Sequence, residues 1–413
     1  MGTALALAER SRGRTAPNPN VGCVIVREGR VVGRGWTQAG GRPHAEAMAL
    51  AEAGVNARGA TAYVTLEPCA HQSSRGPACS DLLIEAGVAR VVAALEDPDI
   101  RTAGQGFARL QADGITVTWG ARVNEARRSM AGFLTRQALG RPHVTLKFAT
   151  SLDGCIAMAD GSSRWITGPH ARAHAHLERS RHEAILVGRG TYEADAPRLD
   201  VRLRGLEARA PRRVIVSTIL APTLSAAPSL RHSSESWNIP VGDRDGASPG
   251  DPSVRWGDGN GASDAAPSLR HSSESWNIPV GDHDGASPGD PGVRWGDGRS
   301  AGDGNDAVGG IGAGVGGAGW TVISSPHDIA LLPNVDHILV EGGAAVASAF
   351  LAVDLVDRLL LYRAPILIGG GKPALGDIGL TDLCAAHGRW AIVDARQLGS
   401  DRLEVYERER NEA

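Results

Sequence analysis

The chain has 413 residues, a formal net charge of −3 and five cysteines. The length exceeds one ordinary domain and predicts two or three, while the slightly acidic charge argues against nucleic-acid binding, which needs clustered Lys and Arg. The odd number of cysteines favours a reducing compartment over a disulfide framework. No apolar run is long enough to span a bilayer, and Met1 leads into an amphipathic helix without a secretory pattern, so a cytoplasmic enzyme is expected.

Residues 1–140 predict a layered α/β domain. The patterns of apolar and turn residues give helices at 3–10, 45–53, 81–86, 106–112 and 123–139 and strands at 21–26, 30–34, 61–66, 90–95 and 115–119. The first two strands form a hairpin around Glu28-Gly29. Pro43 opens the second helix at its first position and Gly54 ends it. Alternating strands and helices place a functional site at the strand ends.

Within this domain a histidine, a glutamate and two cysteines indicate a catalytic zinc site. His44 and Glu46 fall in the first turn of one helix, Cys69 follows a strand and Cys79 begins the next helix. One imidazole and two thiolates suit tetrahedral Zn²⁺ with the fourth position open for water, which leaves Glu46 free to move protons. This order of residues is typical of zinc-dependent nucleobase deaminases. Helix N-termini are expected to favour both thiolates.

Residues 70–78, which separate the two cysteines, form a longer connection than the short Cys-x-x-Cys signature. This loop is expected to hang over the metal, where it could hold a charged group. A structural zinc, or two buried cysteines unrelated to a surface histidine, is the alternative interpretation of the same residues.

A second α/β domain is expected over residues 141–413. Its strands are predicted at 143–149, 183–187, 212–217, 320–324, 337–341 and 357–364. Lys147 lies in the middle of the first of these otherwise apolar strands. Because a charge there is costly without a partner or a task, Lys147 is a candidate functional residue.

A repeated segment interrupts this second domain. Residues 226–259 recur at 265–298 with only two changes, Arg244 to His283 and Ser253 to Gly292. The composition of residues 226–319, rich in Gly, Pro, Ser and Asp, predicts a disordered insertion, and two copies are too few for a solenoid. Gly312, Gly314 and Gly317 match a dinucleotide fingerprint by letter only, since no strand precedes them and no helix follows directly.

Motifs in both halves resemble the bifunctional riboflavin-biosynthesis deaminase-reductase family of bacteria. In the first half these are Pro17 to Gly22 (PNPNVG), His44 to Glu46 (HAE) and Glu67 to His71 (EPCAH). In the second half they are 145–154 (TLKFATSLDG), 161–167 (GSSRWIT), 339–343 (LVEGG) and 367–371 (LIGGG). The resemblance covers the chain up to about residue 220 and again from about 320.

The resemblance implies a cytidine-deaminase-like α/β/α domain followed by a dihydrofolate-reductase-like α/β domain. The first would hydrolytically deaminate 2,5-diamino-6-(5-phosphoribosylamino)pyrimidin-4-one. The second would use NADPH to reduce the ribosyl group, giving 5-amino-6-(5-phosphoribitylamino)uracil.

The same resemblance assigns site residues. Zn²⁺ would be held by His44, Cys69 and Cys79, and the catalytic residues would be Glu46 and Lys147. The NADPH contacts would be Ala149, Trp165, Thr191, Asp195, Ser217 and the turn beginning at Gly343. The substrate contacts would be Asn18 and His71 in the first domain and Ser163, Arg179, Leu199, Arg202 and Glu341 in the second. Arg75, a further expected substrate contact, lies in the loop between the two cysteines, where a cation could meet the phosphate.

Three other interpretations remain at this stage. The chain could be a nucleic-acid deaminase, although it lacks a basic stripe, or a scaffold with a structural metal and a partner-binding tail. It could also deaminate while the insertion impairs the reductase. The partners expected are a small pyrimidine ribotide and further copies of the chain, with no nucleic acid and no membrane.

Overall fold

The computed structural model describes residues 1–71, 76–218 and 319–410. The expected insertion at 226–319, apart from Gly319, lies outside these residues, as does the glycine pattern at 312–317. Among the described helices, each is too short or too polar to traverse a bilayer. Two separate sheets, one of five and one of eight strands, organise the described residues, and a third sheet has two short strands.

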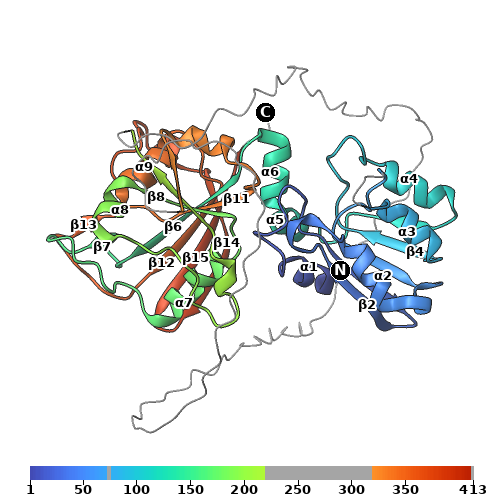
Figure 1. The fold of residues 1–413 in the computed structure, drawn as a ribbon. Coiled ribbons are helices and arrows are strands. Elements are labelled where there is room, and N and C mark those ends of the chain that lie inside the picture. The colour runs from blue at the N-terminus through green and yellow to red at the C-terminus, as the bar shows by residue number, and fades with distance from the viewer. Residues whose placement is uncertain (72–75, 219–318, 411–413) are drawn as a thin grey trace, which may run out of the picture. The chain divides into compact units, whose positions relative to one another are not determined.

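The first sheet has the order β2-β1-β3-β4-β5 (Figure 1). Its strands are β1 (Gly22–Arg27), β2 (Arg30–Trp36), β3 (Thr61–Val64), β4 (Arg90–Ala93) and β5 (Thr116–Thr118). The accompanying helices are α1 (Gly2–Ala8), α2 (Ala45–Ala53), α3 (Cys79–Glu85), α4 (Gln105–Ala112), α5 (Val123–Ser129) and α6 (Ala131–Leu139). The pair β1/β2 is the expected hairpin, and β3, β4 and β5 run parallel.

Helices cover both faces of this sheet. Val24 of β1 packs with Ala4 of α1, whereas its neighbour Cys23 belongs to the cluster that contains Ala45 and Ala49 of α2. Because successive side chains of a strand point to opposite faces, α1 and α2 lie on opposite sides. This three-layer arrangement confirms the expected α/β/α class.

Small residues let α2 approach the sheet closely. A Cβ atom placed on Gly35 of β2 would lie 2.0 Å from the Ala45 carbonyl oxygen, and one on Gly33 would lie 2.1 Å from that of Ala49. Real Cβ contacts are never this short, so only glycine fits at either position. The start of α2 is therefore held by direct packing of backbone on backbone.

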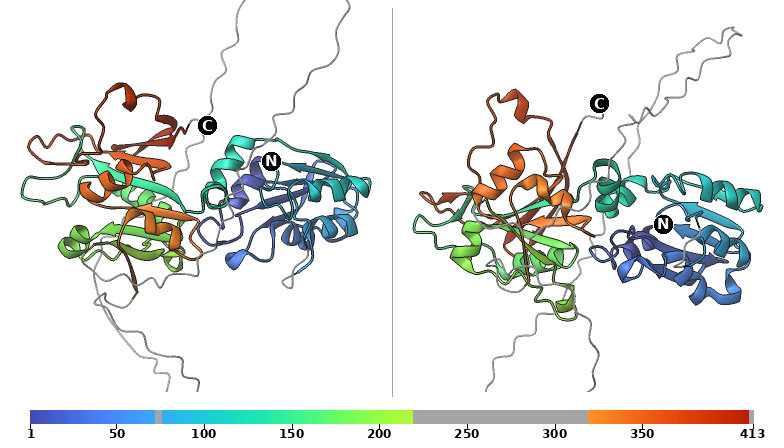
Figure 2. Two further views of the ribbon diagram at one scale, coloured as in Figure 1. Left: turned by 90° about the horizontal axis from the view of Figure 1, so that it is seen from above. Right: turned by 45° about the horizontal axis from the view of Figure 1, so that its top comes forward.

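The second sheet has the order β10-β9-β8-β11-β6-β12-β15-β14. Its strands are β6 (His143–Thr150), β8 (Ala184–Gly188), β9 (Arg212–Val216), β10 (Trp320–Ile323), β11 (His337–Val340), β12 (Arg358–Arg363), β14 (Trp390–Leu398) and β15 (Asp401–Arg408). The six strands from β10 to β12 pair in parallel, and β15 and β14 add an antiparallel hairpin. Strands far apart in the sequence thus lie side by side, as the mixing of green and orange segments in Figure 2 shows.

The remaining elements of the second half are three helices and a small strand pair. They are α7 (Pro169–Arg179), α8 (Arg189–Asp195), α9 (Ala344–Ala352), β7 (Cys155–Ala157) and β13 (Lys372–Pro373). Ala171 and Ala175 of α7 pack on one face of the large sheet, and Ala347 and Phe350 of α9 pack on the other.

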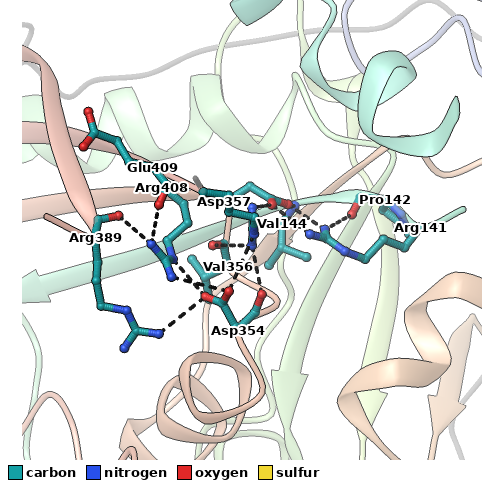
Figure 3. Close-up of polar contacts among 10 residues, drawn as sticks. Arg141, Pro142, Val144, Asp354, Val356, Asp357, Arg389, Arg408 and Glu409 are labelled. Atoms are coloured by element: carbon teal, nitrogen blue, oxygen red, sulfur yellow. Dashed lines mark hydrogen bonds and ion pairs between the residues drawn. The ribbon is translucent and has the colours of Figure 1, made fainter. Parts of the chain in front are cut away.

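A buried charge network fixes the start of β6 beside the start of β12 (Figure 3). Asp357 accepts hydrogen bonds from Arg141 Nη1 at 2.7 Å and Nη2 at 2.9 Å, and from the Val144 amide at 2.8 Å. Arg410 Nη1 donates to the same carboxylate at 2.5 Å. Burial opposes ionisation of Asp357, but the Arg141 hydrogen bonds and nearby positive charge outweigh it and lower its pKa to about 2.

Two local predictions were wrong. The helix expected over 123–139 is divided at Met130 (φ −101°), and beside the break the Ser129 carbonyl accepts a hydrogen bond from the Asn20 side chain at 3.2 Å. Pro43 precedes α2 instead of opening it, since His44 is the N-cap. Helix α6 nevertheless ends at Leu139, and β6 begins at His143.

Candidate active sites

Three segments bring the predicted zinc ligands together. His44 caps α2, Cys69 follows β3 and Cys79 is the first residue of α3. Their ligand atoms all lie within 4.8 Å of one another, with His44 Nδ1 3.3 Å from Cys79 Sγ and 3.7 Å from Cys69 Sγ. A ring nitrogen and two sulfurs at this spacing fit the donor set of Zn²⁺.

The prediction that helix N-termini favour both thiolates is wrong. The pKa of Cys79 is raised well above its ordinary value, first by its hydrogen bond with Cys69 and then by burial, whereas that of Cys69 is lowered. Only Cys79 starts a helix, whereas Cys69 accepts a hydrogen bond from the Cys79 backbone amide at 3.3 Å. Hydrogen bonding from the Cys79 thiol lowers the pKa of Cys69, and His44 adds to the effect. The first N–H group of α3 therefore favours the thiolate of Cys69, a ligand outside the helix.

Glu46 lies beside this cluster in the first turn of α2. Its side chain is buried, and it lines a cavity of about 380 Å³ together with His44 and Cys69. Burial raises the pKa of Glu46, while the charge of His44 opposes the shift. A carboxyl group that is reluctant to ionise, next to a metal-type cluster, suits a group that accepts and returns a proton.

Asn18 and His71 also line the cavity, as their predicted substrate roles require. The Asn18 amide nitrogen lies 3.2 Å from His44 Nε2 and donates to the Gly41 carbonyl at 3.2 Å, so Asn18 also fixes the ring of a zinc ligand. His71 Nδ1 lies 3.3 Å from Thr102 Oγ1. Arg75, the third predicted contact, lies outside the described residues.

Two acids at this site were given no role from the sequence: Glu67, which was quoted only as part of a motif, and Asp97. Glu67 accepts hydrogen bonds from the backbone amides of Asp97, Gly104 and Phe107 and so shapes the cavity wall. Asp97 lines the cavity, and burial raises its pKa to about 7. The signal available was an acid-rich stretch, Glu96 to Asp99, directly after β4.

A second site lies on the face of the large sheet that α7 covers. Arg179 of α7 donates from Nε and Nη2 to the two carboxylate oxygens of Glu341, which follows β11, at 2.8 and 2.9 Å. Lys147 Nζ of β6 lies 3.8 Å from Glu341 Oε2. The sequence-predicted lysine therefore has its partner.

The other predicted residues of this half fall into two groups. Ala149, Ser163, Trp165 and Arg202 line a cavity of about 230 Å³ with Lys147 and Arg179. Thr191 and Gly343 contact each other, through a hydrogen bond from the Gly343 amide to Thr191 Oγ1 at 3.2 Å. The residues outside that cavity lining are Thr191, Asp195, Leu199, Ser217, Glu341 and Gly343.

Among the predicted site residues of the second half, the side chains of Leu199 and Trp165 differ most in their exposure to solvent. The Leu199 side chain is buried in the hydrophobic cluster under α7, so it has no free surface for a ligand. Trp165, in contrast, is 66% exposed, and the Arg172 guanidinium lies over its ring at 4.8 Å. An exposed indole with nearby cations fits the rings and phosphates of a dinucleotide such as NADPH.

A buried pair beneath Lys147 was not predicted. Tyr362 of β12 lies 2.7 Å, through its hydroxyl, from His174 Nδ1 of α7. Lys147 Nζ lies 5.8 Å from the centre of the Tyr362 ring, within range of a cation–π contact. Burial lowers the pKa of His174, which favours the neutral ring that can accept a hydrogen bond from the tyrosine hydroxyl.

Comparison with known proteins agrees with both halves. Residues 1–95 match the model of the cytidine and deoxycytidylate deaminase zinc-binding region, and residues 142–239 and 332–403 match that of the RibD C-terminal domain. A crystal structure from Thermotoga maritima, described as a diaminohydroxyphosphoribosylaminopyrimidine deaminase/5-amino-6-(5-phosphoribosylamino)uracil reductase, superposes with a TM-score of 0.69. It is 28% identical and covers 99% of this chain and 97% of its own.

Two relatives are both called riboflavin biosynthesis protein RibD. The Escherichia coli protein is 53% identical over 207 residues, which is 50% of this chain and 56% of that relative, so the chain matches about half of its length. The Mycobacterium tuberculosis H37Rv protein is 33% identical over 411 residues, 98% of this chain and 95% of the relative.

Fold, site and matches define a class of protein in which a zinc-binding deaminase-type domain precedes a RibD C-terminal-type domain. The long alignment with the mycobacterial relative then settles the family. The chain belongs to the family of the riboflavin biosynthesis protein RibD, and the resemblance carried by the sequence motifs is confirmed.

Proposed function

We propose that the chain is a bifunctional enzyme of riboflavin biosynthesis. It deaminates 2,5-diamino-6-(5-phosphoribosylamino)pyrimidin-4-one and then reduces the ribosyl group with NADPH to give 5-amino-6-(5-phosphoribitylamino)uracil. The observation that carries the proposal is the cluster of His44, Cys69 and Cys79 with buried Glu46 at its side, in a chain whose second sheet also presents Lys147. The division between the two activities falls at residue 140.

In the first domain His44, Cys69 and Cys79 would hold Zn²⁺, which would supply a water molecule that is readily ionised near neutral pH. Glu46 would take one proton from that water and pass it to the pyrimidine ring nitrogen as the oxygen bonds to the amino-bearing carbon. It would then pass the second proton, from the new hydroxyl group, to the amino group, which leaves as ammonia when the C–N bond breaks. Asn18 orients His44 and the pyrimidine. His71 and Arg75 contact the substrate.

In the second domain NADPH supplies the hydride. Ala149, Trp165, Thr191, Asp195, Ser217 and Gly343 contact the cofactor. Lys147 steadies the negative charge that develops on the ribosyl ring oxygen when the hydride adds to the anomeric carbon and the C–O bond breaks, and Glu341, itself held by Arg179, keeps the lysine in place. Ser163, Arg202 and the backbone at Leu199 contact the sugar phosphate.

The alternative, a deaminase whose reductase is impaired by the inserted residues, has less support. Strands β9 and β10 flank residues 219–318, yet they pair in unbroken parallel register from Arg213 and Trp320 to Val216 and Ile323. The sheet of the second domain is therefore not interrupted between the two strands that precede and follow the insertion. Deleting residues 226–319 and comparing NADPH oxidation before and after tests the alternative directly.

The main test follows ammonia release and NADPH consumption separately with the diaminopyrimidine ribotide. Glu46→Gln is expected to retain zinc and lose deamination by about 10²–10⁴-fold, while it still reduces the deaminated ribotide. Lys147→Met is the matched variant for the second step, with reduction lost and ammonia release unchanged. Ammonia release that Glu46→Gln leaves intact would refute the assigned role.

The chain is further proposed to act in the cytoplasm as a homo-oligomer, without nucleic-acid or membrane partners. All five cysteines are free thiols, which suits a reducing compartment. Light scattering coupled to size exclusion measures the mass, and a monomer at micromolar concentration would contradict the oligomer.

A further inference from the structure

The cavity beside the zinc ligands carries more acidic than basic side chains. Its lining includes the carboxylates Glu67, Asp97 and Asp99, in addition to Glu46, and two arginines. Glu67 is occupied by backbone amides. Asp99 is occupied by Arg101, whose Nε lies 2.9 and 3.0 Å from the two carboxylate oxygens. This pair neutralises Arg101, so it offers little attraction to an anionic ligand.

Arg42 is the other arginine of the lining. The side chain is half-buried, and within the described residues it makes no hydrogen bond and no ion pair. It also lines a smaller cavity with Pro77 and Cys79, so it lies where the two cavities meet. Partly buried cations normally find a partner, and the five N–H donors of Arg42 remain available to a ligand.

The surroundings hold Arg42 at this place. Gly41 has φ +86°, and a Cβ on it would lie 2.7 Å from Asn18 Cγ, so the segment before His44 packs tightly on Asn18. A Cβ on Gly76 would lie 2.9 Å from Arg42 Nη1, so the guanidinium rests against a residue without a side chain. Arg42 is two residues from a zinc ligand and cannot move far from the cavity.

We propose that Arg42 binds the phosphate of the deaminase substrate and so makes the first site specific for a ribotide over the phosphate-free riboside. This inference rests on the proposed function, because it takes the deamination of a phosphorylated pyrimidine as given. A planar guanidinium pairs with two phosphate oxygens at once, which supplies both affinity and orientation. Arg42 touches the substrate away from the reacting ring and is a specificity residue, with no part in proton transfer.

The test compares Arg42→Ala and Arg42→Lys with the unmodified enzyme on two substrates, the diaminopyrimidine ribotide and the riboside made from it by phosphatase. For Arg42→Ala the kcat/KM of ribotide deamination is expected to fall about 10–100-fold, mainly through KM, because a hydrogen-bonded charge pair is lost. The riboside value is expected to stay the same. Arg42→Lys is expected to retain part of the kcat/KM that Arg42→Ala loses, since lysine keeps the positive charge but lacks the planar guanidinium that pairs with two phosphate oxygens.

Arg34→Ala is the matched control, because Arg34 is an exposed arginine of β2 paired with Glu52 outside the cavity. Zinc content and reduction of the deaminated ribotide check that each variant is folded. If the riboside is turned over too slowly to measure, inhibition by inorganic phosphate decides, and Arg42→Ala is expected to weaken that inhibition about tenfold or more.

Equal losses on both substrates, an unchanged KM for the ribotide, or unchanged phosphate inhibition would each overturn the inference while leaving the deaminase assignment in place. Failure of the unmodified, zinc-loaded enzyme to deaminate either substrate would overturn the proposed function instead, and the role of Arg42 with it.

Discussion

Arg179 and Glu341 form a two-point ion pair across 162 positions of the chain, with both carboxylate oxygens accepting from one guanidinium. Burial alone would favour a neutral Glu341, but the charges of Arg179 and Lys147 outweigh it and lower its pKa to about 2. The carboxylate is therefore ionised over the whole working range, and it keeps Lys147 beside a negative partner.

Replacing Arg179 with Met should show that the low pKa of Glu341 depends on Arg179. Without its main partner the buried Glu341 should bind protons more readily, so its pKa should rise and the pH profile of reduction should gain a new acid limb. The lowered pKa stabilises the native fold above about pH 4.3, the ordinary value, and this contribution is lost as the pH falls towards 2. Arg179→Lys is the control, and a profile unchanged in Arg179→Met would contradict the argument.

Among the acidic residues away from the surface, Asp357 should cause the largest loss of folding stability when it is replaced. Asp357→Ala leaves Arg141 and Arg410 without their shared partner, so the free energy of unfolding should fall by about 3–5 kcal/mol. Since the pKa of Asp357 is lowered, its contribution is present above about pH 3.9 and declines as the pH approaches 2. Urea unfolding at pH 7 and pH 3 measures both effects, with Asp382→Ala on an exposed turn as the control.

For the reduction step, the aromatic ring of Tyr362 should matter more than the hydrogen bond between its hydroxyl and His174. Tyr362→Phe keeps the ring under Lys147 and should cost about 1 kcal/mol of stability for the lost hydrogen bond. Tyr362→Leu removes the cation–π contact as well and should lower the kcat/KM of reduction several-fold more than Tyr362→Phe does. Equal activities of the two variants would show that the ring does not position Lys147.

Gly35 should tolerate no side chain. Gly35→Ala places a methyl group against the Ala45 carbonyl and should displace the start of α2, which lowers both the melting temperature and the rate of deamination. A loss of at least about 1–3 kcal/mol is typical of such overpacking. Gly190→Ala, in α8 with open space around it, is the matched control and should be neutral or slightly stabilising.

Chelation of zinc should affect one activity only. Because the ligands come from three separate segments, removing the metal should abolish ammonia release and lower the melting temperature, while reduction of the deaminated ribotide continues. Readdition of Zn²⁺ should restore both properties. Cys384→Ser, which removes an exposed thiol, should bind zinc as the unmodified chain does.

Local signals account for most of what the sequence predicted. The N-terminal ends of α2 and α3 are marked by nearby residues, so His44, Glu46 and Cys79 could be placed, and the parallel strands are short apolar runs. The hairpin of β14 and β15 was missed because no residue of β14 is fully buried, so its apolar and polar residues do not alternate clearly. The hydrogen bond of Asn20 with Ser129 beside the break at Met130, and the contact of His174 with Tyr362, join residues 109 and 188 positions apart, which periodicity does not detect.

The order of strands also bears on how the chain folds during its own synthesis. All three metal ligands and all five strands of the first sheet lie before residue 119, so the emerging polypeptide can complete its metal-binding half while translation continues. Strand β6 is next to emerge, yet its two neighbours, β11 and β12, are made nearly two hundred residues later. The two halves therefore become able to fold at different stages of translation. In the second half, the central strand β6 has no neighbouring strand to pair with until β11 and β12 have been synthesised.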